Sequence, residues 1–391
     1  MRRAVVLGMA RSGQAAAALL ERHGVEVVRV DRTLGNDGDL SLLEGADVLV
    51  KSPGVPRDNR LVQAALIPVW SEVELAAHFL PNPIIGVTGT NGKTTTVEWL
   101  GAMFRAAGLD VAVAGNVGRA LAAVEAGPDV WIVCELSSFQ LEDIHALRPR
   151  VAVLINLEPD HLDRHGSFEA YRDAKLRIFE NQTSADFAVV PRGFGDVPGE
   201  ARRVEFAAVD PLPAEPGLPG AHNRENAAAA SAAARAVGLP EDAIAEALRS
   251  FPGVAHRLEL VVQRNGVRFV NDSKATNTAA ARRALAAYEE PLHVILGGSR
   301  KGESFDELAR EVHGRAYLIG ETARELAEAL ERADVPYELS GDLATALAAA
   351  ARAARPGEVV LLSPACASYD QFRDFEHRGE EFRRLVQNLS G

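Results

Sequence analysis

Cysteine is scarce in this chain, which has only Cys134 and Cys366 among its 391 residues. The two lie far apart in apolar stretches, so we expect no disulfide framework and a cytoplasmic, reducing location. No run of about 18 apolar residues occurs, so we expect no membrane-spanning helix. The basic and then apolar start breaks off at Gly8, too early for a signal peptide, and is interpreted as a first strand.

An excess of positive charge is also lacking. The 42 Lys and Arg residues are outnumbered by 54 Asp and Glu, and a formal net charge of -12 disfavours a dedicated nucleic-acid-binding protein. Lysine itself is rare, and the other 37 basic residues are arginine. We expect such a chain to keep lysine where a guanidinium cannot substitute, although chance retention is the alternative. The five lysines are Lys51, Lys93, Lys175, Lys274 and Lys301.

Patterning predicts a globular α/β protein. Strand-like apolar runs alternate with Ala- and Leu-rich helical stretches, which is typical of mostly parallel sheets flanked by helices. A chain of 391 residues favours two or three domains. Linker-like sequence at 79–83 and at 251–253 suggests two boundaries. We therefore predict three domains, namely a Rossmann-like one at 1–82, a P-loop ATPase one at 83–252 and a second Rossmann-like one at 253–391.

The segment VTGTNGKTT, residues 87–95, is the sharpest functional signal. It follows an apolar run and opens a helical stretch, so backbone N–H groups around its glycines can bind phosphate oxygens. Lys93 is expected to contact terminal phosphates, and the Thr94 hydroxyl is expected to reach Mg²⁺. A strict Walker A motif has glycine where this chain has Val87, so the segment is a variant P-loop. A plain Gly-rich turn before a helix is the alternative.

Two later segments supply candidate metal ligands. The apolar run WIVC ends in Glu135, and an acid at the carboxyl edge of a neighbouring strand is well placed to hold Mg²⁺. Asp160 and His161 follow the next strand, and a ring nitrogen of His161 can ligate a second metal ion. Lys175 lies on the helix that follows. A solvated loop with an ordinary surface lysine is the alternative.

Polar motifs recur in the last part of the chain. Asn226 lies near a helix start, where an amide can read an adenine edge or, more commonly, cap the helix. Ligands bind open α/β sheets at the carboxyl ends of strands. Four motifs are each expected at such an end and together predict a ligand site: HR (256–257), NDSKATN (271–277), GGSRKG (297–302) and SPACASYDQF (363–372).

Over essentially its whole length the chain resembles the Mur ligase family, ATP-dependent amide-forming enzymes of peptidoglycan precursor synthesis. TGTNGKTT is shared with folylpolyglutamate synthases and specifies only the superfamily. ELSSFQLE, NDSKATN and LLSPACASYDQFRDFEHRG resemble the members that add D-glutamate. The GMARSG stretch departs from the family's GLGLTG-like pattern.

The resemblance implies an ADP-forming ligase that joins D-glutamate to UDP-N-acetylmuramoyl-L-alanine through an acyl phosphate. It implies ATP and two Mg²⁺ ions as cofactors, and we expect a monomer that binds neither nucleic acid nor membrane. Three alternatives stay open. They are another carboxylate–amine ligase such as a folylpolyglutamate synthase, a P-loop motor or switch, and a non-catalytic nucleotide-sugar sensor.

The resemblance also implies roles for individual residues. ATP contacts are implied for Gly89, Thr90, Asn91, Gly92, Lys93, Thr94, Thr95, Asn226, Arg257 and Asp272. Metal ligands are implied at Thr94, Glu135, His161 and Lys175, the last as a carbamate. The catalytic residues are Lys93, Lys175, His161 and Lys274. Substrate contacts are implied for Arg11, Ser12, Asn116, Ser137, Thr276, Lys301, Ser368, Tyr369 and Phe375.

Overall fold

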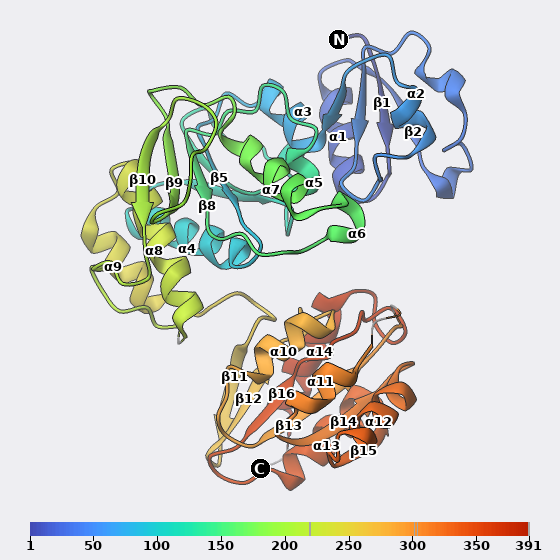
Figure 1. The fold of residues 1–391 in the computed structure, drawn as a ribbon, viewed down its shortest axis with the longest axis vertical. Helices are drawn as coiled ribbons and strands as arrows, with labels where there is room; N and C mark the ends of the chain where they lie inside the picture. The colour runs from blue at the N-terminus through green and yellow to red at the C-terminus, as the bar shows by residue number, and fades with distance from the viewer. Residues whose placement is uncertain (219, 301, 303, 390–391) are drawn as a thin grey trace. The chain divides into compact units, whose positions relative to one another are not determined.

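The computed structural model describes residues 1–218, 220–300, 302 and 304–389, and the chain divides into two compact units, Met1–Phe251 and Pro252–Gly391 (Figure 1). Among the described residues, the first unit holds a four-stranded and a six-stranded sheet, and the second holds a six-stranded sheet. Nearly all strand pairs are parallel, and helices cover the sheets, so the predicted α/β class is confirmed.

The first sheet has the strand order β2-β1-β3-β4, and all its pairs are parallel. Helices α1 and α3 pack together on one face, and α2 lies with the short 3-10 turn η2 on the other. The elements are β1 (Arg3–Leu7), α1 (Arg11–Arg22), β2 (Glu26–Val30), η1 (Arg32–Leu34), η2 (Leu40–Leu43), β3 (Val48–Lys51), α2 (Arg60–Ala64), β4 (Val69–Ser71) and α3 (Glu72–Phe79).

The central sheet has the order β10-β9-β8-β5-β7-β6 and is parallel throughout. Strand β5 lies where the chain turns from one side of the sheet to the other, which is where open α/β sheets bind ligands. The strands are β5 (Ile84–Thr88), β6 (Val111–Gly115), β7 (Trp131–Glu135), β8 (Val151–Leu154), β9 (Phe187–Pro191) and β10 (Arg202–Phe206). The helices are α4 (Lys93–Ala106), η3 (Leu121–Ala123), α5 (Ser138–Leu141), α6 (Leu162–His165), α7 (Phe168–Leu176), η4 (Arg177–Phe179), α8 (Ala221–Ala236) and α9 (Glu241–Ser250).

One hydrophobic core runs continuously from the first sheet into the central one. Val6 of β1 and Leu20 of α1 belong to the same buried cluster as Leu121 of η3, Cys134 of β7 and Leu154 of β8. Burying this apolar surface is the main favourable term that joins the two sheets. The continuity explains why residues on both sides of the predicted boundary at 82/83 form a single compact unit, and the domain limits at 1–82 and 83–252 stay a prediction.

Helix α3 reinforces this joint with two buried carboxylates. Glu72 accepts a hydrogen bond from the Ala122 N–H at 2.5 Å, and Glu74 accepts from the N–H groups of Ala146 at 2.8 Å and Leu147 at 2.9 Å. Burial raises the pKa of Glu72 to about 7. The pair therefore supplies acceptors for backbone donors that would otherwise be buried without a partner.

The second unit has the strand order β11-β12-β16-β13-β14-β15. Its first strand, β11, pairs antiparallel with β12 and was missed in the sequence, because its residues are half-buried or exposed and its apolar run covers only Leu260–Val262. Helices α10, α11 and α12 bury one face of the sheet, and α13 and α14 bury the other. The strands are β11 (Glu259–Arg264), β12 (Val267–Asn271), β13 (Leu292–Gly297), β14 (Gly314–Ile319), β15 (Tyr337–Gly341) and β16 (Val359–Leu362). The helices are α10 (Thr278–Leu285), α11 (Asp306–Glu311), α12 (Ala323–Arg332), α13 (Leu343–Ala353) and α14 (Phe375–Gln387).

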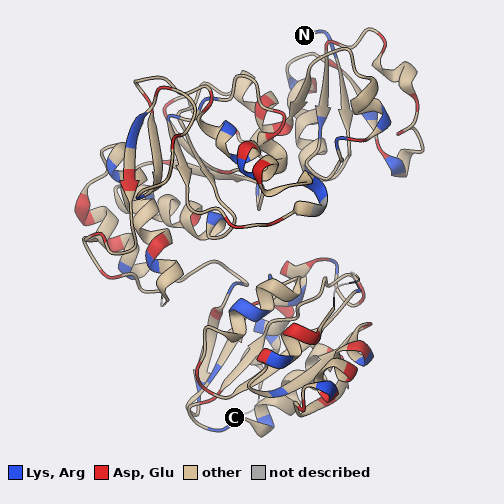
Figure 2. Cartoon of the chain, in the orientation of Figure 1, with Lys and Arg blue, Asp and Glu red and all other residues tan. Residues whose placement is uncertain are grey.

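Acidic and basic residues are interspersed over both units (Figure 2). No helix within the described part of the chain is both long enough and apolar enough to cross a membrane.

Candidate active site

The variant P-loop joins β5 to α4, as the sequence predicts. Gly92 caps α4 with φ of 81°, a left-handed conformation that favours glycine. A Cβ at this position would lie 2.0 Å from Oδ1 of Asn226, which is a buried residue of α8. Gly92 thus serves two purposes, since it turns the backbone into the helix and leaves room for the Asn226 amide.

The loop between Thr88 and Gly92 is pinned by side chains from beyond β8. The Thr90 hydroxyl donates a hydrogen bond to the Glu158 carbonyl at 3.1 Å and accepts one from the Tyr171 hydroxyl at 3.0 Å. The Asn91 N–H donates to Oδ1 of Asn156 at 2.9 Å, and its side-chain amide donates to Oε2 of Glu158 at 3.0 Å. The predicted nucleotide loop is therefore held in shape by several hydrogen bonds, which favours a preorganised site.

Glu135 ends β7 beside the P-loop, and its two carboxylate oxygens have different partners. The Thr94 hydroxyl donates to Oε2 at 2.7 Å, and the Asn116 amide donates to Oε1 at 3.0 Å. The pairing of β5 with β7 brings these residues together from three separate segments of the chain. Carboxylate and hydroxyl oxygens are the hard donors that Mg²⁺ prefers, so Thr94 and Glu135 fit one magnesium ion.

Lys93 and Lys175 converge on one carbonyl oxygen. Each ammonium donates to the Gly89 carbonyl at 2.8 Å, and Lys93 also donates to the Thr90 carbonyl at 2.9 Å. Lys175 is buried, and its ammonium lies 4.7 Å from the centre of the Tyr171 ring. Burial, and then the charge of Lys93, lower the pKa of Lys175 to about 6. Half or more of this amine is therefore neutral at pH 7, the form that reacts with an electrophile.

His161 lies in the same region of the structure, but among the described residues it does not form a metal-binding group with Glu135. Its backbone has φ of 52° at the start of α6, and its ring lies 4.9 Å from that of Phe139 and 6.4 Å from that of Tyr171. Among the described residues, no three His, Cys, Asp or Glu side chains gather as a metal-binding group. Mg²⁺ commonly takes only one or two protein carboxylates and completes its shell with water and phosphate oxygens, so the donors present are compatible with it.

The substrate residues predicted in the first sheet lie at the carboxyl ends of its strands. Arg11 begins α1 and donates to the Gly118 carbonyl at 2.6 Å, which links it to the loop that follows Asn116; Ser12 is the next residue of α1. Sequence reasoning missed Asp31, whose carboxylate accepts from the Met9 N–H at 2.6 Å and so closes the glycine-rich loop. The sequence signal for Asp31 was an acidic residue at the end of a predicted apolar strand, the same signal that indicated Glu135.

Ser137, predicted to bind substrate, is used structurally. Its hydroxyl accepts from the Gln140 N–H, and the Gln140 side chain accepts from the Ser137 N–H, so the two form a capping box at the start of α5.

In the second unit, three of the four predicted motifs follow strands, namely those after β12, β13 and β16. The fourth expectation was wrong, because His256 and Arg257 precede β11, the strand that the sequence did not reveal. Asp272 is buried beyond β12 and accepts from the Ser363 hydroxyl at 2.8 Å, which ties two of the motifs together. Burial raises the pKa of Asp272 to about 7.

The remaining predicted residues of this unit follow β12 and β16 or begin α14. Lys274 and Thr276 follow Asp272, Ser368 is buried, and Tyr369 is largely exposed. Phe375 begins α14, and its carbonyl accepts from the Ser273 hydroxyl at 2.8 Å. Lys301 lies outside the described residues.

Arg378 on α14 is a further residue that sequence reasoning missed. Its fully buried guanidinium donates to the Ser273 hydroxyl at 3.0 Å and to the carbonyls of Ser273, Cys366 and Ala367. It therefore fixes the 271–277 motif against the 363–372 motif. The signal was present, because Arg378 lies four residues before Phe382, on the same buried side of the helix.

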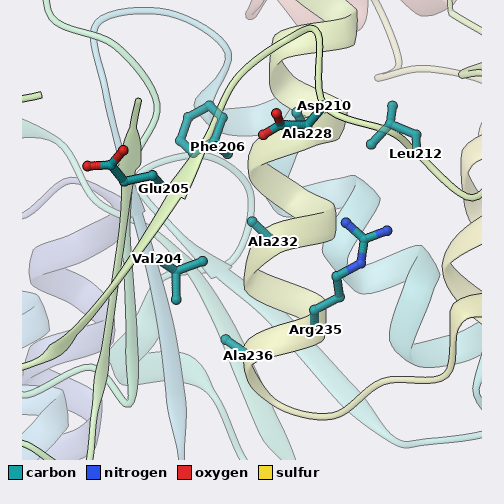
Figure 3. Close-up of a pocket in the computed structure, with 9 residues that line it drawn as sticks. All are labelled: Val204, Glu205, Phe206, Asp210, Leu212, Ala228, Ala232, Arg235 and Ala236. Carbon is teal, nitrogen blue, oxygen red and sulfur yellow. The ribbon is translucent and has the colours of Figure 1, made fainter. Parts of the chain in front are cut away.

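A cavity of about 380 Å³ lies between β10 and α8, away from the P-loop (Figure 3). Ala228, Ala232 and Ala236 of α8 form one wall. Of its charged lining residues, Asp210 pairs with Arg192 and Arg235 with Glu241, and the predicted site residues do not line it. The candidate active site is the P-loop region and not this cavity.

A P-loop at the switch point of a parallel sheet, with an acid on the next strand, defines a nucleotide-phosphate-binding α/β protein. Comparison narrows this class. The model of the Mur ligase middle domain matches residues 87–194, and the model of the Mur ligase glutamate ligase domain matches residues 256–366. The chain belongs to the Mur ligase family, whose members are ATP-dependent carboxylate–amine ligases.

Similar curated proteins bear the name UDP-N-acetylmuramoylalanine–D-glutamate ligase. The one from Pelotomaculum thermopropionicum is 42% identical, with 99% of this chain and 98% of the relative covered. Those from Acidobacterium capsulatum and Geobacillus kaustophilus are each 40% identical, with 98% and 99% of this chain and 96% and 98% of the relatives covered. The first alignment runs over 445 positions, more than the 391 residues here, so the relative has residues that this chain lacks.

Solved structures give the same fold at low sequence identity. The MurC ligase from Thermotoga maritima aligns with a TM-score of 0.63 at 19% identity, with both chains fully covered. MurF from Acinetobacter baumannii aligns with a TM-score of 0.58 at 20% identity, covering 88% of this chain and 86% of its own. E. coli FolC with DHPP and ADP reaches 0.59 at 19% identity, covering 81% and 93%. These likenesses support the fold and leave the choice of substrate open.

Proposed function

We propose that this protein joins D-glutamate to UDP-N-acetylmuramoyl-L-alanine at the expense of ATP in peptidoglycan precursor synthesis. The observation that carries the proposal is the 42% identity, over nearly the full length of both chains, with a ligase named for that reaction. The folylpolyglutamate-synthase-like alternative is less supported, since the likeness to FolC rests on fold alone.

In the proposed reaction, the substrate carboxylate attacks the γ-phosphate of ATP, and an acyl phosphate and ADP result. The amine of D-glutamate then attacks the acyl carbon, phosphate leaves and the amine loses a proton. The protein's part is to position the reactants and offset negative charge. Lys93, together with the N-terminus of α4, supplies positive charge where the phosphates are expected.

We propose that Thr94 and Glu135 hold Mg²⁺ and that His161 and carbamylated Lys175 hold a second ion. When bound, magnesium supplies charge neutralisation of the phosphate oxygens. The support for Thr94 and Glu135 is their hydrogen bond of 2.7 Å beside the P-loop. The support for Lys175 is its lowered pKa, because only a neutral amine adds to carbon dioxide to form a carbamate.

The other implied roles are divided among the three predicted domains. We propose that residues 1–82 bind the UDP moiety through Arg11 and Ser12, and that Asn116 and Ser137 extend that site. Residues 83–252 bind ATP through Gly89 to Thr95 and Asn226. Residues 253–391 contribute the ATP contacts Arg257 and Asp272 and the catalytic residue Lys274. The proposed D-glutamate pocket comprises Thr276, Lys301, Ser368, Tyr369 and Phe375. We also propose a monomer working in the cytoplasm, which suits two buried free cysteines.

The test measures phosphate release from ATP with Mg²⁺ and UDP-N-acetylmuramoyl-L-alanine, across D-glutamate, L-glutamate, L-lysine and diaminopimelate. We expect release with D-glutamate alone. Release with another amino acid would keep the ligase reaction and refute the assigned pocket. Release that needs no amino acid would favour an ATPase or switch.

A further inference from the structure

Lys51 is a buried lysine that the proposed reaction does not use. Its side chain at the end of β3 has no exposed surface, and its ammonium lies 2.9 Å from Oδ2 of Asp143 and 3.3 Å from the Val55 carbonyl. Asp143 follows α5, so this ion pair joins the first sheet to the central one. A buried charge is tolerated when a partner of opposite sign lies beside it, so the pair depends on both members.

Three more charged or titratable side chains surround this pair. Arg57 lies 3.4 Å from Oε2 of Glu142 and 3.7 Å from Oδ1 of Asp143. Nδ1 of His165 lies 3.2 Å from Oε1 of Glu142. We call Lys51, Arg57, Glu142, Asp143 and His165 the Lys51 cluster. It brings two adjacent carboxylates together, and Lys51 is its fully buried cation.

The loop after Lys51 contacts the proposed nucleotide-sugar site. The Ser52 hydroxyl donates to the Gly8 carbonyl at 2.6 Å, and a Cβ on Gly8 would lie 2.9 Å from the Val55 side chain. The loop at 52–55 therefore packs directly on the glycine-rich turn between β1 and α1. A ligand seated on that turn meets a surface whose position Lys51 helps to fix.

The same loop and cluster hold α6, the helix that His161 begins. Arg164 donates to the Val55 carbonyl at 2.9 Å, so this carbonyl accepts hydrogen bonds from both Arg164 and Lys51. Nε2 of His165 lies 3.0 Å from the Ser138 hydroxyl, while Nδ1 faces Glu142. Helix α6 is four residues long and makes one turn, so these two anchors largely decide where His161 points.

We propose that Lys51 is a positioning residue that couples the nucleotide-sugar site to the metal site through the Lys51 cluster and α6. The inference rests on the proposed function, which assigns the first sheet to the UDP substrate and His161 to the metal. Lys51 offsets the charge of Asp143 and Glu142 and holds the 52–55 loop against α6. We expect the UDP substrate to tighten metal binding, and because coupling of two sites is reciprocal, metal then tightens substrate binding by the same factor.

The experiment uses the full chain with a non-hydrolysable ATP analogue and Mn²⁺ as the metal probe. The Mn²⁺ dissociation constant is measured by electron paramagnetic resonance with and without saturating UDP-N-acetylmuramoyl-L-alanine. For the wild type we expect the substrate to tighten Mn²⁺ binding by roughly tenfold, within the usual range of coupling. For Lys51→Met we expect this ratio to fall towards one and the substrate KM to rise more than kcat falls.

Asp143→Asn and the double variant Lys51→Met/Asp143→Asn guard against a folding defect in the first variant. If the two residues act as a pair, Asp143→Asn also lowers the ratio, and the double variant is no worse than either single one. Arg172→Met, which removes an exposed cation from the neighbouring helix α7, serves as the control with an unchanged ratio.

A ratio near one in the wild type, or an equal ratio in wild type and all Lys51 and Asp143 variants, would overturn the proposal. The proposed function is judged separately, by D-glutamate-dependent phosphate release of the wild type. Coupling can thus fail while the ligase assignment stands.

Discussion

Single side chains in this protein behave differently according to what surrounds them. Lys93 and Lys175 donate to the same carbonyl, yet only Lys175 is fully buried, and its pKa falls to about 6. The neighbouring positive charge of Lys93 adds to the effect of burial. One lysine is thus suited to a phosphate contact and the other to reaction as a neutral amine.

The carbamate proposal predicts that Lys175→Arg lowers kcat by about 100-fold or more, because a guanidinium keeps the charge but forms no carbamate. Turnover is measured by phosphate release, and folding by thermal unfolding. Carbon-13 NMR with labelled bicarbonate should show a protein-bound carbamate in the wild type and not in the variant. Arg172→Lys, an exposed change on the same helix, is the matched control. Near-wild-type activity would remove Lys175 from the mechanism.

Glu72 gives a prediction for stability against pH. Its pKa is raised to about 7 in the folded protein from an ordinary 4.5, so the folded state binds the proton more tightly than the unfolded state. Its contribution to stability is fully present below pH 4.5 and is lost as the pH rises through 7. Glu72→Gln should therefore match the wild type at pH 4 and exceed it at pH 8 by up to about 3 kcal/mol.

The measurement for Glu72 is urea unfolding of both proteins from pH 4 to pH 8. Glutamine still offers an oxygen to the Ala122 N–H, so loss of that hydrogen bond does not confuse the comparison. A stability difference that stays constant over this range would contradict the prediction.

At the scale of elements, the strand–loop–helix unit β5–α4 depends on a close approach of α8. Gly92 and Gly108 both have positive φ, 81° and 71°, at opposite ends of α4. Nothing lies within 4 Å of a Cβ on Gly108, whereas a Cβ on Gly92 meets the Asn226 amide. Substitution of Gly108 therefore measures backbone strain alone, whereas substitution of Gly92 adds a steric clash.

We expect Gly108→Ala to lose only about 1–2 kcal/mol, the usual cost of left-handed backbone with a side chain. Gly92→Ala should lose more and should also weaken nucleotide binding by at least tenfold, because the clash displaces either Asn226 or the start of α4. Urea unfolding and titration with an ATP analogue measure the two effects. Equal losses of stability and affinity in both variants would show that the approach of Asn226 is unimportant.

For the molecule as a whole, the hydrophobic clusters of described residues each lie within one unit. The buried clusters of the second unit draw only on residues after Pro252, whereas the first and central sheets share one cluster. Arg378 is a buried cation of the second unit, and it donates to Ser273, Cys366 and Ala367 of that same unit. The buried charge of Arg378 is therefore stabilised by contacts within its own unit.

A fragment of residues 252–391 is predicted to fold alone and to melt cooperatively by circular dichroism, since it falls in the usual size range of independent domains. A fragment of residues 83–251 is the comparison. It loses the packing of α1 and α3 on the shared core, so we expect it to be much less stable or to aggregate. A non-cooperative melt of the 252–391 fragment would contradict the separation of the cores.

The α/β class, the variant P-loop and the family could all be predicted from the amino-acid sequence. These depend on local signals, namely apolar runs, glycines at fixed spacing and a lysine followed by threonines, which remain visible without knowing which strands pair. Strand β11 was not predicted because its residues are half-buried or exposed and its apolar run is short. The expectation that His256 and Arg257 follow a strand was wrong for the same reason.

Contacts between residues far apart in the sequence became known only from the folded chain. Pairing of β5 with β7 brings Glu135 to Thr94, packing of α8 brings Asn226 to Gly92, and burial makes Lys175 a weak base. Lys51 stands out in the sequence only as a rare lysine, and its pairing with Asp143 emerges from the packing of two sheets on one core. Burial and long-range contacts are properties of the folded chain, since they depend on residues far apart in the sequence.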